Sequence, residues 1–370
     1  MLRLFFGISL ALIFYGYFIY PLTVFLLAKL IPSPVKKGDY RPKVTIFIPA
    51  YNEEGMIRRK IENCLALDYP GDKLEVIIAS DGSTDSTASI AREYAPRGVR
   101  LFESPGRKGK TAILNEYARE SKGDIIVFSD ASGLLNTEAV LRLAENFNDE
   151  SVGCVCGLYR LLPKNDNLAA RGYLAYLGYD IKMKKAESAF ASILGAHGAL
   201  YAIRKSLFKP LPGYAINDDF YIPINILLSG YRAIYEDKAI ATDYIEYCLG
   251  DEFRRRIRIS FGNWQQIRDF SGSLTLKRPL LAWQFFSHKI LRSLLPFFIV
   301  FVAAVSFLYG YGLISISLLI LIIAALSALL LRNSKFAVRF LHAPFFFVAG
   351  NIAYIIGTVK FFLGYKTISW

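Results

Sequence analysis

A long uncharged stretch near the N-terminus, residues 5–28, constrains this chain more than any other feature of its sequence. A helix of ~20 apolar residues is long enough to cross the hydrocarbon core of a bilayer. A cleavable signal peptide has a shorter apolar core and a cleavage site of small residues, and neither is visible here. We therefore predict an uncleaved transmembrane anchor over residues 1–35.

Basic residues around the anchor predict its orientation. Only Arg3 precedes it, whereas four basic residues follow it closely: Lys36, Lys37, Arg41 and Lys43. Positive charge next to a span gathers on the cytoplasmic side of the membrane. We therefore expect an integral protein of the plasma or inner membrane whose following domain lies in the cytoplasm.

The C-terminal part of the chain predicts further spans. Residues 293–331 carry no charge and are interrupted at the Gly-Tyr-Gly of 310–312, which fits a hairpin of two spans. Residues 340–359 are long enough for one more. The region 291–370 is therefore expected to hold two or three spans.

Two details of this end concern its placement. A fourth span would put the C-terminus outside, whereas Lys360 and Lys366 favour the inside, so the side of the C-terminus stays open. Residues 276–290 mix basic and aromatic side chains, which is typical of an amphipathic helix in the membrane interface. We predict an interfacial helix there.

The formal net charge of +13 limits the partners to be expected. A basic excess fits nucleic acid, an anionic membrane surface or a polyanionic small ligand. No nucleic-acid-binding module is legible in the sequence, so no nucleic acid partner is expected. With apolar segments at both ends, the membrane surface accounts for most of the charge.

The middle of the chain, residues 36–275, has the pattern of a soluble α/β domain. Short apolar runs alternate with helical stretches. The predicted strands are 44–49, 74–79, 99–102 and 124–129, and the predicted helices are 52–67, 86–94 and 110–121. Such alternation predicts a Rossmann-like domain with a mostly parallel sheet, whose ligands bind at the carboxyl ends of the strands.

Polar clusters follow three of these strands, at 49–53, 80–83 and 130–132. No glycine-rich dinucleotide motif follows the first strand, and no P-loop motif occurs, so nicotinamide-dependent oxidoreductases and P-loop enzymes fit poorly. Carboxylates stand where those folds have glycines. A diphosphate held through carboxylates needs a bridging cation, for which we expect Mg²⁺ or Mn²⁺.

At these clusters the chain resembles the family 2 glycosyltransferases, of the membrane-bound kind related to cellulose, hyaluronan and poly-N-acetylglucosamine synthases. The resemblance runs over residues 44–264 and implies a GT-A domain that binds a nucleotide-sugar donor, expected to be a UDP-sugar. The carboxylate matching Asp81 hydrogen-bonds the base in that family. The resemblance implies donor contacts from the following residues of three motifs: Pro49, Ala50, Tyr51, Glu53, Asp81 and Lys110.

The family's metal motif, Asp-x-Asp, is matched only in part. Asp130 occupies its first position, and Ser132 stands where the second carboxylate is usual. The resemblance implies that Asp130 binds both donor and metal, with the Ser132 hydroxyl or a water in the second position. We therefore expect a divalent cation that is bound less tightly than by two carboxylates.

An aspartate pair carries the predicted chemistry. Asp218 and Asp219 precede Gly230 by the spacing that resembles the family's Glu-Asp and Gly-Tyr-Arg motifs. The resemblance makes Asp219 the catalytic base and Asp218 its support, because an inverting transfer needs one carboxylate to accept the proton of the acceptor hydroxyl. The structural alternative is a solvated pair at a helix N-terminus, where carboxylates are favoured anyway.

Basic residues stand where processive members of the family carry Gln-x-x-Arg-Trp. The arginines there are Arg255, Arg256 and Arg258, and Ile259 takes the place of the tryptophan. We predict that at least one of these arginines contacts the donor diphosphate, since guanidinium matches phosphate oxygens. A basic strip on the inner leaflet is the alternative. Without the tryptophan, one sugar per acceptor encounter is expected.

The combined prediction is an inverting glycosyltransferase that moves a sugar to a lipid-linked or glycan acceptor in cell-envelope glycan synthesis. Two alternatives stay open: a processive synthase that also extrudes its polymer, and a catalytically silent nucleotide-sugar-binding scaffold of an envelope-assembly complex. Intact Asp81, Asp130 and Asp219 argue against the silent scaffold. The sequence predicts neither the sugar, the linkage nor the oligomeric state.

Overall fold

The structure is a computed structural model that describes residues 1–246, 248–273 and 278–365. The chain divides into two compact units. The sheet unit comprises Ala28–Leu162 and Lys184–Tyr244, and the helical unit comprises Met1–Leu27, Pro163–Met183 and the chain from Ile245 onward. Residue 275, a predicted domain boundary, lies outside the described residues, as do residues 276–277 of the predicted interfacial helix and Lys366.

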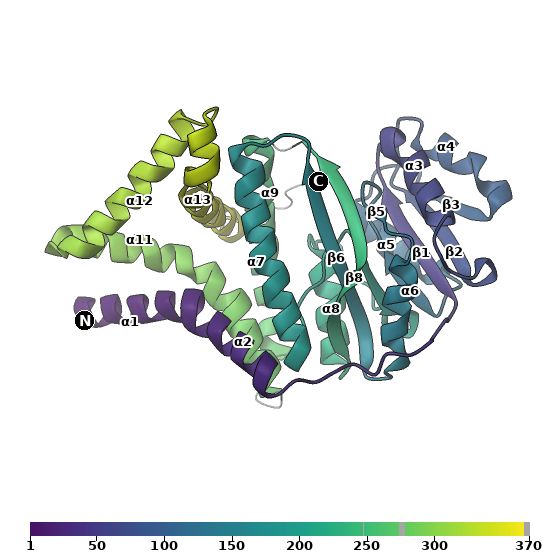
Figure 1. The fold of residues 1–370 in the computed structure, drawn as a ribbon, viewed down its shortest axis with the longest axis horizontal. Helices are drawn as coiled ribbons and strands as arrows, with labels where there is room; N and C mark the ends of the chain where they lie inside the picture. Colours follow the sequence, from purple (N-terminus) through teal and green to yellow (C-terminus); the bar gives the residue numbers. More distant parts are fainter. Residues whose placement is uncertain (247, 274–277, 366–370) are drawn as a thin grey trace. The chain divides into compact units, whose positions relative to one another are not determined.

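The first four long strands of the sheet unit are parallel, as the alternating pattern predicts. They are β1 (Val44–Ala50), β2 (Leu74–Ser80), β3 (Val99–Glu103) and β4 (Ile125–Phe128), and they lie in the order β3-β2-β1-β4. The connections between them contain α3 (Glu54–Leu65), α4 (Thr87–Glu93) and α5 (Lys110–Tyr117). Figure 1 shows β1, β2 and β3 side by side with α3 and α4. The predicted fold class is confirmed.

Antiparallel strands extend the sheet beyond β4. They are β5 (Leu134–Leu135), β6 (Val152–Pro163), β7 (Tyr201–Arg204) and β8 (Arg232–Ile245). Among the described residues the sheet has eight strands in the order β3-β2-β1-β4-β7-β6-β8-β5. The pairs β4–β7, β6–β7 and β5–β8 are antiparallel. Strand β8 thereby brings residues from the end of the domain to the metal-motif loop.

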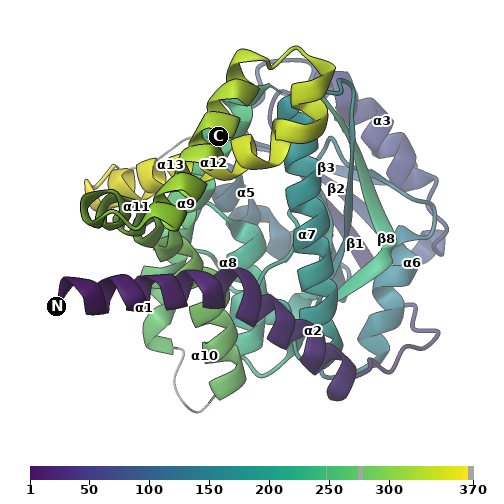
Figure 2. The ribbon, with the colours of Figure 1, turned by 60° about the vertical axis from the view of Figure 1, so that its left-hand side comes forward.

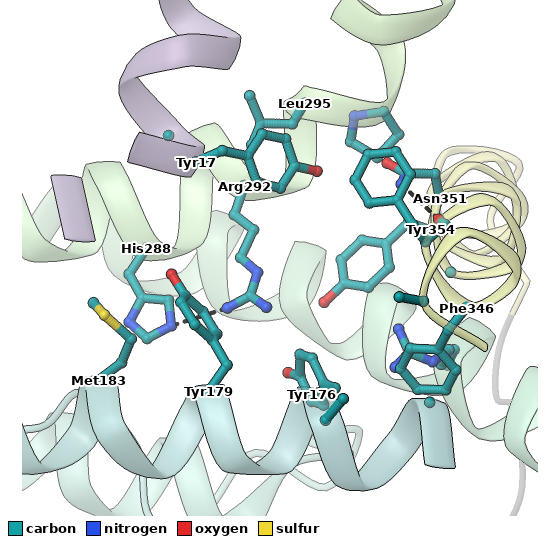
Figure 3. Close-up of a pocket in the computed structure, with 18 of the residues that line it drawn as sticks. Tyr17, Tyr176, Tyr179, Met183, His288, Arg292, Leu295, Phe346, Asn351 and Tyr354 are labelled. Atoms are coloured by element: carbon teal, nitrogen blue, oxygen red, sulfur yellow. Dashed lines mark hydrogen bonds between the residues drawn. The ribbon is translucent and has the colours of Figure 1, made fainter. Parts of the chain in front are cut away.

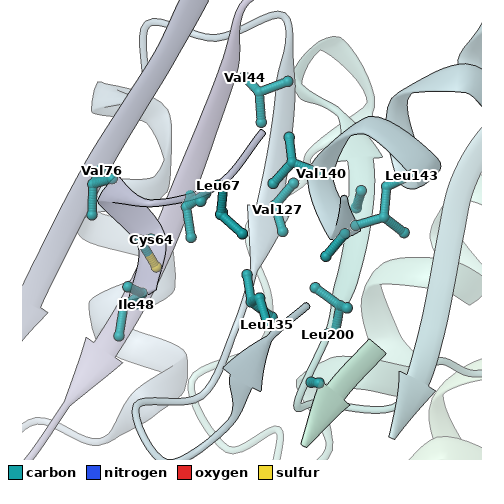
Figure 4. Close-up of a cluster of buried hydrophobic side chains, with 14 of the residues drawn as sticks. Val44, Ile48, Cys64, Leu67, Val76, Val127, Leu135, Val140, Leu143 and Leu200 are labelled. Carbon is teal, nitrogen blue, oxygen red and sulfur yellow. The ribbon is translucent and has the colours of Figure 1, made fainter. Parts of the chain in front are cut away.

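One apolar core lies on the face of the sheet covered by α3, α4 and α6 (Ala139–Ala144). Every second residue of β1 enters it, because side chains of a strand alternate between faces. Figure 4 shows Ile48, Val76 and Val127 of the parallel strands with Cys64 of α3 and Leu143 of α6. This core fixes the parallel strands, and with them the loops at their carboxyl ends.

The opposite face of the sheet carries aromatic side chains. Phe47 of β1 and Phe128 of β4 have ring centroids 5.9 Å apart, and Tyr201 of β7 stacks on Phe128 at 4.9 Å. All three side chains are fully buried. They join the parallel and antiparallel halves of the sheet beneath the candidate site.

The helical unit contains most of the apolar sequence. Among the described residues, four helical segments are long and apolar enough to cross a membrane: Leu2–Leu30, Pro279–Tyr309, Gly312–Leu330 and Ala337–Phe362. Figure 2 shows the first of them as one continuous purple rod of α1 (Leu2–Phe14) and α2 (Tyr20–Leu30). Apolar helices near both ends of the chain were predicted, and the structure bears this out.

The last three segments follow one another along the chain. Helices α11 (Arg292–Tyr309) and α12 (Gly312–Leu330) are separated at Gly310, whose φ of +68° is a left-handed conformation suited to glycine. Helix α10 (Pro279–Phe285) runs on through a π-helical segment, η8 (Phe286–Leu291), into α11. The interfacial helix and the exact domain limits stay predictions.

Candidate active site

A buried lysine joins three of the predicted motifs. The Lys110 ammonium, on the first residue of α5, lies 3.0 Å from the Asp130 carboxylate and 3.4 Å from that of Asp218. The Lys110 side chain is 10% exposed. Burial by itself would lower the pKa of Lys110, but the Asp130 and Asp218 carboxylates outweigh it and raise that pKa above its ordinary value. Lys110 is therefore a fixed positive charge among carboxylates.

The two predicted catalytic aspartates have different surroundings at the start of α8 (Asp218–Leu228). Asp218 is buried and accepts a hydrogen bond from the Tyr201 hydroxyl at 3.1 Å. Burial raises the pKa of Asp218, against the opposing effect of Lys110. Asp219 is only half-buried, and its carboxylate accepts the Gly198 backbone N–H at 3.2 Å. Asp219 is thus the member of the pair that a substrate can reach.

Gly198 marks the point where these groups converge. A β-carbon added to Gly198 would lie 3.5 Å from an Asp219 carboxylate oxygen, 3.7 Å from one of Asp130 and 3.7 Å from the Lys110 nitrogen. The loop that carries Gly198 is held to α8, because the Ala196 N–H donates to the Asp219 carbonyl at 2.7 Å. The structure therefore brings together residues that the sequence places in three separate motifs.

The first predicted donor motif follows β1 without a break. Pro49 and Ala50 are the last residues of this strand, and Asn52 adopts a left-handed φ of 53°. The Asn52 side chain fixes the turn, since its carbonyl oxygen accepts the Thr84 N–H at 2.9 Å. Burial, with Asp130 and Asp243 nearby, raises the pKa of Glu53.

The Asp81 carboxylate organises the loop before α5. It accepts the backbone N–H of Lys108 at 2.6 Å and that of Gly109 at 2.8 Å. Gly82 allows the backbone of this loop to lie close to its own backbone. Its φ is +64°, and an added β-carbon would lie 2.4 Å from the Gly106 carbonyl carbon. Sequence reasoning gave Asp81 a contact with the base and did not foresee that it shapes the loop.

The Tyr51 ring contacts the loop that precedes α5. The Arg107 guanidinium lies 4.0 Å from the centroid of the Tyr51 ring. Arginine favours the faces of aromatic rings, which suits a flat surface on which a base can rest. The residues Arg107, Tyr51 and Asp81 are therefore candidates for contacting a nucleoside.

A carboxylate that sequence reasoning missed stands next to the metal motif. The Ser132 hydroxyl donates to the Asp243 carboxylate at 2.9 Å, and Asp243 is buried on β8. Asp243 and Ser132 are 111 residues apart in sequence, and only the pairing of β5 with β8 brings them together. No sequence signal marks Asp243.

The residues of the metal motif suit a divalent cation that is held partly by the substrate. Among the described residues no group of three His, Cys, Asp or Glu side chains is placed to hold a metal. The Asp130 carboxylate is 38% exposed, and Asp243 adjoins its loop. Mg²⁺ and Mn²⁺ sites often take one or two carboxylates and complete their shell with phosphates of the substrate and water. Asp130 and Asp243 are the carboxylates available for such a site. The Ser132 hydroxyl donates its proton to Asp243 and its oxygen can still accept a cation, so the predicted role of Ser132 as a ligand stays a prediction.

The loop that carries Asp130 is anchored from below by Lys60 of α3. The Lys60 side chain is fully buried, donates to the Ser129 hydroxyl at 2.7 Å and donates to the Gly133 carbonyl. Burial lowers the pKa of Lys60. Both ends of the short 129–133 loop are therefore tied to one side chain.

The three predicted diphosphate arginines lie on α9 (Leu249–Phe270), in the helical unit. Arg255 donates to the Tyr173 hydroxyl at 2.6 Å, and Arg256 forms an ion pair with Glu252 at 2.9 Å. Arg258 is half-buried on the same helix. Their contact with a donor stays a prediction.

The chain is similar to known glycosyltransferases. Residues 45–211 match the model of the family "Glycosyl transferase family 2". A probable glycosyltransferase of Bacillus subtilis, YdaM, is 28% identical over 73% of this chain and 64% of its own length. A poly-beta-1,6-N-acetyl-D-glucosamine synthase of Staphylococcus aureus is 27% identical over 65% of this chain and 60% of its own length. The chain thus spans less than two thirds of the length of these relatives.

A solved structure shares the fold over nearly the whole chain. It is a mannosyltransferase of Pyrobaculum calidifontis in complex with GDP-Man and Mn²⁺, with a TM-score of 0.72 and 24% identity. The match covers 98% of this chain and 100% of that one. Together with the family match, this likeness shows a GT-A fold with apolar helices at both ends.

Proposed function

We propose that this chain transfers a sugar from a nucleotide-sugar donor to a lipid-linked or glycan acceptor, with inversion. The premise is the match of residues 45–211 to the family "Glycosyl transferase family 2". The observation that carries the proposal is the convergence of Lys110, Asp130 and Asp219 on Gly198. A cation and two accessible carboxylates meet at one point at the carboxyl end of the parallel strands. A silent scaffold has no need for that arrangement.

Asp219 is proposed as the general base. The acceptor hydroxyl oxygen forms a bond to the anomeric carbon while the bond from that carbon to the diphosphate breaks. The hydroxyl proton passes to the Asp219 carboxylate, and the nucleoside diphosphate leaves from the opposite face. The Gly198 N–H orients the carboxylate, and the buried Asp218 holds Lys110 in place beside it.

Donor binding is proposed to use the loops at the strand ends. Tyr51, Arg107 and Asp81 are proposed to contact the nucleoside, and Lys110 to offer its charge to the donor phosphates. A divalent cation held by Asp130 and Asp243 would neutralise charge on the leaving diphosphate. The mannosyltransferase of similar fold was solved with Mn²⁺, which supports this choice of cofactor.

The nucleotide of the donor has two candidates. We propose a UDP-sugar from the resemblance of the Asp81 motif, whereas the solved mannosyltransferase holds GDP-Man. The catalytic domain is proposed to face the cytoplasm, since basic residues follow the first apolar segment. The relatives named poly-beta-1,6-N-acetyl-D-glucosamine synthase favour a polymer synthase as the second candidate function.

One experiment tests the assignment of the base. Purified full-length protein with Mn²⁺ is screened against UDP- and GDP-sugars for donor hydrolysis and transfer, and the active donor is then used with variants. Asp219→Asn is nearly isosteric, so it should bind donor normally while transfer falls by ~10²–10⁴. The matched control, Asp72→Asn, changes an exposed aspartate of the same unit and should keep full activity.

Two outcomes would count against this assignment. Near wild-type transfer by Asp219→Asn would remove it as the base and make Asp218 the candidate. Activity in both single Asn variants would refute a catalytic role for the pair. Loss of donor binding in Asp219→Asn would also contradict the proposal, because the proposed role leaves binding intact.

A further inference from the structure

The helical unit contains a cavity that the transfer reaction, as proposed, does not use. Its volume is about 350 Å³. Residues from three of the four apolar segments line it, together with the part of α7 (Leu168–Phe190) that belongs to the helical unit. Much of the wall is apolar, including Leu295, Pro296 and Phe347. The cavity thus lies among helices that are long and apolar enough to cross a membrane.

A charged side chain lies in this mostly apolar cavity. Arg292, the first residue of α11, points into the cavity in Figure 3, toward the rings of Tyr176 and Tyr179. The guanidinium hydrogen-bonds to the His288 ring at 3.2 Å and lies 5.5 Å from the Tyr176 centroid. Within the part of the chain that the structure describes, no ion pair joins it to a carboxylate, although Asp180 is within electrostatic range.

Charge in such surroundings is costly and is retained in membrane helices mainly where it meets a ligand or a counter-charge. Arg256, which also lines the cavity, differs from Arg292 because Glu252 neutralises it at 2.9 Å. Of the two arginines that line the cavity, Arg292 is therefore the one that no ion pair joins to a carboxylate in the described part of the chain. Hydroxyls of Tyr176 and Tyr354 add hydrogen-bond donors to the same wall.

The backbone around the cavity is also irregular. Two of the apolar segments change to π-helix where they line it, at η1 (Tyr15–Ile19) and at η8. Insertions of this kind occur frequently at functional sites. Tyr17 of η1 and His288 of η8 face the cavity from these two segments (Figure 3).

From the charge, the hydroxyls and the apolar wall we propose that this cavity binds a lipid phosphate, with the phosphate on Arg292 and the start of the hydrocarbon chain against Leu295, Pro296 and Phe347. Guanidinium pairs with phosphate oxygens through two parallel hydrogen bonds, and phenolic hydroxyls supply further donors. A soluble anion would not need the apolar wall, and a neutral glycan would not need the cation. This inference rests on the proposed function and extends it, because it gives the acceptor a lipid phosphate anchor.

Binding is tested without any donor, so that it does not depend on sugar transfer. Full-length protein in a neutral detergent is titrated with dodecyl phosphate and followed by native mass spectrometry. The comparison probes are dodecanol, inorganic phosphate, pyrophosphate and dodecyl glucoside. We expect one dodecyl phosphate per chain and much weaker binding of the other probes.

Substitutions assign the site. Arg292→Met should weaken dodecyl phosphate binding by about tenfold or more, and Arg292→Lys should be intermediate because lysine lacks the planar fork. Arg332→Met, which removes an exposed charge from the same unit, should bind as wild type. Tyr176→Phe keeps the ring and should weaken binding about fivefold through loss of one hydroxyl. It tests the site even where Arg292→Met does not fold.

Three results would overturn the proposal. Competition by inorganic phosphate or pyrophosphate as strong as by dodecyl phosphate would make it a soluble-anion site. Binding of dodecyl glucoside that is equally strong, and insensitive to Arg292→Met, would make it a glycan pocket. Unchanged dodecyl phosphate binding in both Arg292→Met and Tyr176→Phe would remove the site altogether. Asp219→Asn should bind dodecyl phosphate normally, which separates failure of this inference from failure of the proposed transfer.

Discussion

Lys110→Met tests whether one buried cation holds the candidate site together. At an effective dielectric constant of about 20, a unit charge pair at the 3.0 Å of Asp130 contributes ~5.5 kcal/mol and one at the 3.4 Å of Asp218 ~4.9 kcal/mol. Desolvation offsets much of this attraction, and solvent screens the Asp130 pair further, because that carboxylate is 38% exposed. Removing one partner of a buried pair typically costs about 3–5 kcal/mol.

The expected effect of Lys110→Met depends on pH. In the wild type the raised pKa of Lys110 keeps its charge, and the stability that it contributes, throughout the neutral range; this stability is lost only above the ordinary lysine pKa. In the variant, the buried Asp218 loses the cation that opposes the effect of burial, so the pKa of Asp218 should rise further. The variant should therefore lose most stability at about pH 8 and regain part of it near about pH 5, where Asp218 takes up a proton.

Thermal unfolding of the full-length protein in detergent measures this effect. A loss of about 3–5 kcal/mol corresponds to a fall in Tm of roughly 6–20 °C for a unit of this size. The matched control is Lys108→Met, because Lys108 pairs with Glu116 at the surface and exposed pairs contribute little. Equal Tm values for the two variants, or a Lys110→Met effect that does not grow with pH, would refute the reasoning.

Four further predictions concern the loops and the product. Gly82→Ala should lower both Tm and nucleotide affinity more than Gly98→Ala does. Both glycines have positive φ, but only at Gly82 would an added β-carbon meet backbone atoms. Equal effects of the two substitutions would mean that only the backbone strain matters. Asp243→Asn should weaken the Mn²⁺ dependence of nucleotide binding measured by calorimetry, and an unchanged dependence would exclude Asp243 from the cation site. Ser132→Asp should make Mn²⁺ binding measurable without nucleotide, since it restores a second carboxylate in the motif. Because Ile259 replaces the family tryptophan, products should lengthen by one sugar per encounter, and a ladder of long products before the acceptor is consumed would contradict this.

Much of the parallel half of the sheet could be predicted because its signals are local. Each of the strands β1 to β4 is a short apolar run that ends at a turn, and each is joined to the next by a helix. Asp81 and Asp130 could be singled out because each follows a predicted strand, whereas Asp219 was identified through the resemblance to the family 2 glycosyltransferases. The periodicity of side chains and the position of turns are properties of adjacent residues.

The antiparallel half and the partners of the site residues depend on long-range pairing instead. Asp243 becomes a neighbour of Ser132 only because β8 pairs with β5, and Tyr201 reaches Asp218 only through the position of β7. Gly198 lies in a loop with no distinctive sequence, yet it is the residue nearest to three charged groups. The cavity around Arg292 likewise draws its wall from segments far apart in the sequence.

The attachment of the 129–133 loop to Lys60 has a consequence for the entropy of donor binding. A free loop of this kind loses ~1–2 kcal/mol of conformational entropy per residue when a ligand orders it. Here Lys60 holds both Ser129 and the Gly133 carbonyl, so that ordering takes place when the chain folds. The free energy gained from the donor contacts at Asp130 is then hardly reduced by the cost of ordering the loop. Lys60→Met should therefore weaken nucleotide binding through a less favourable binding entropy, while the binding enthalpy changes little.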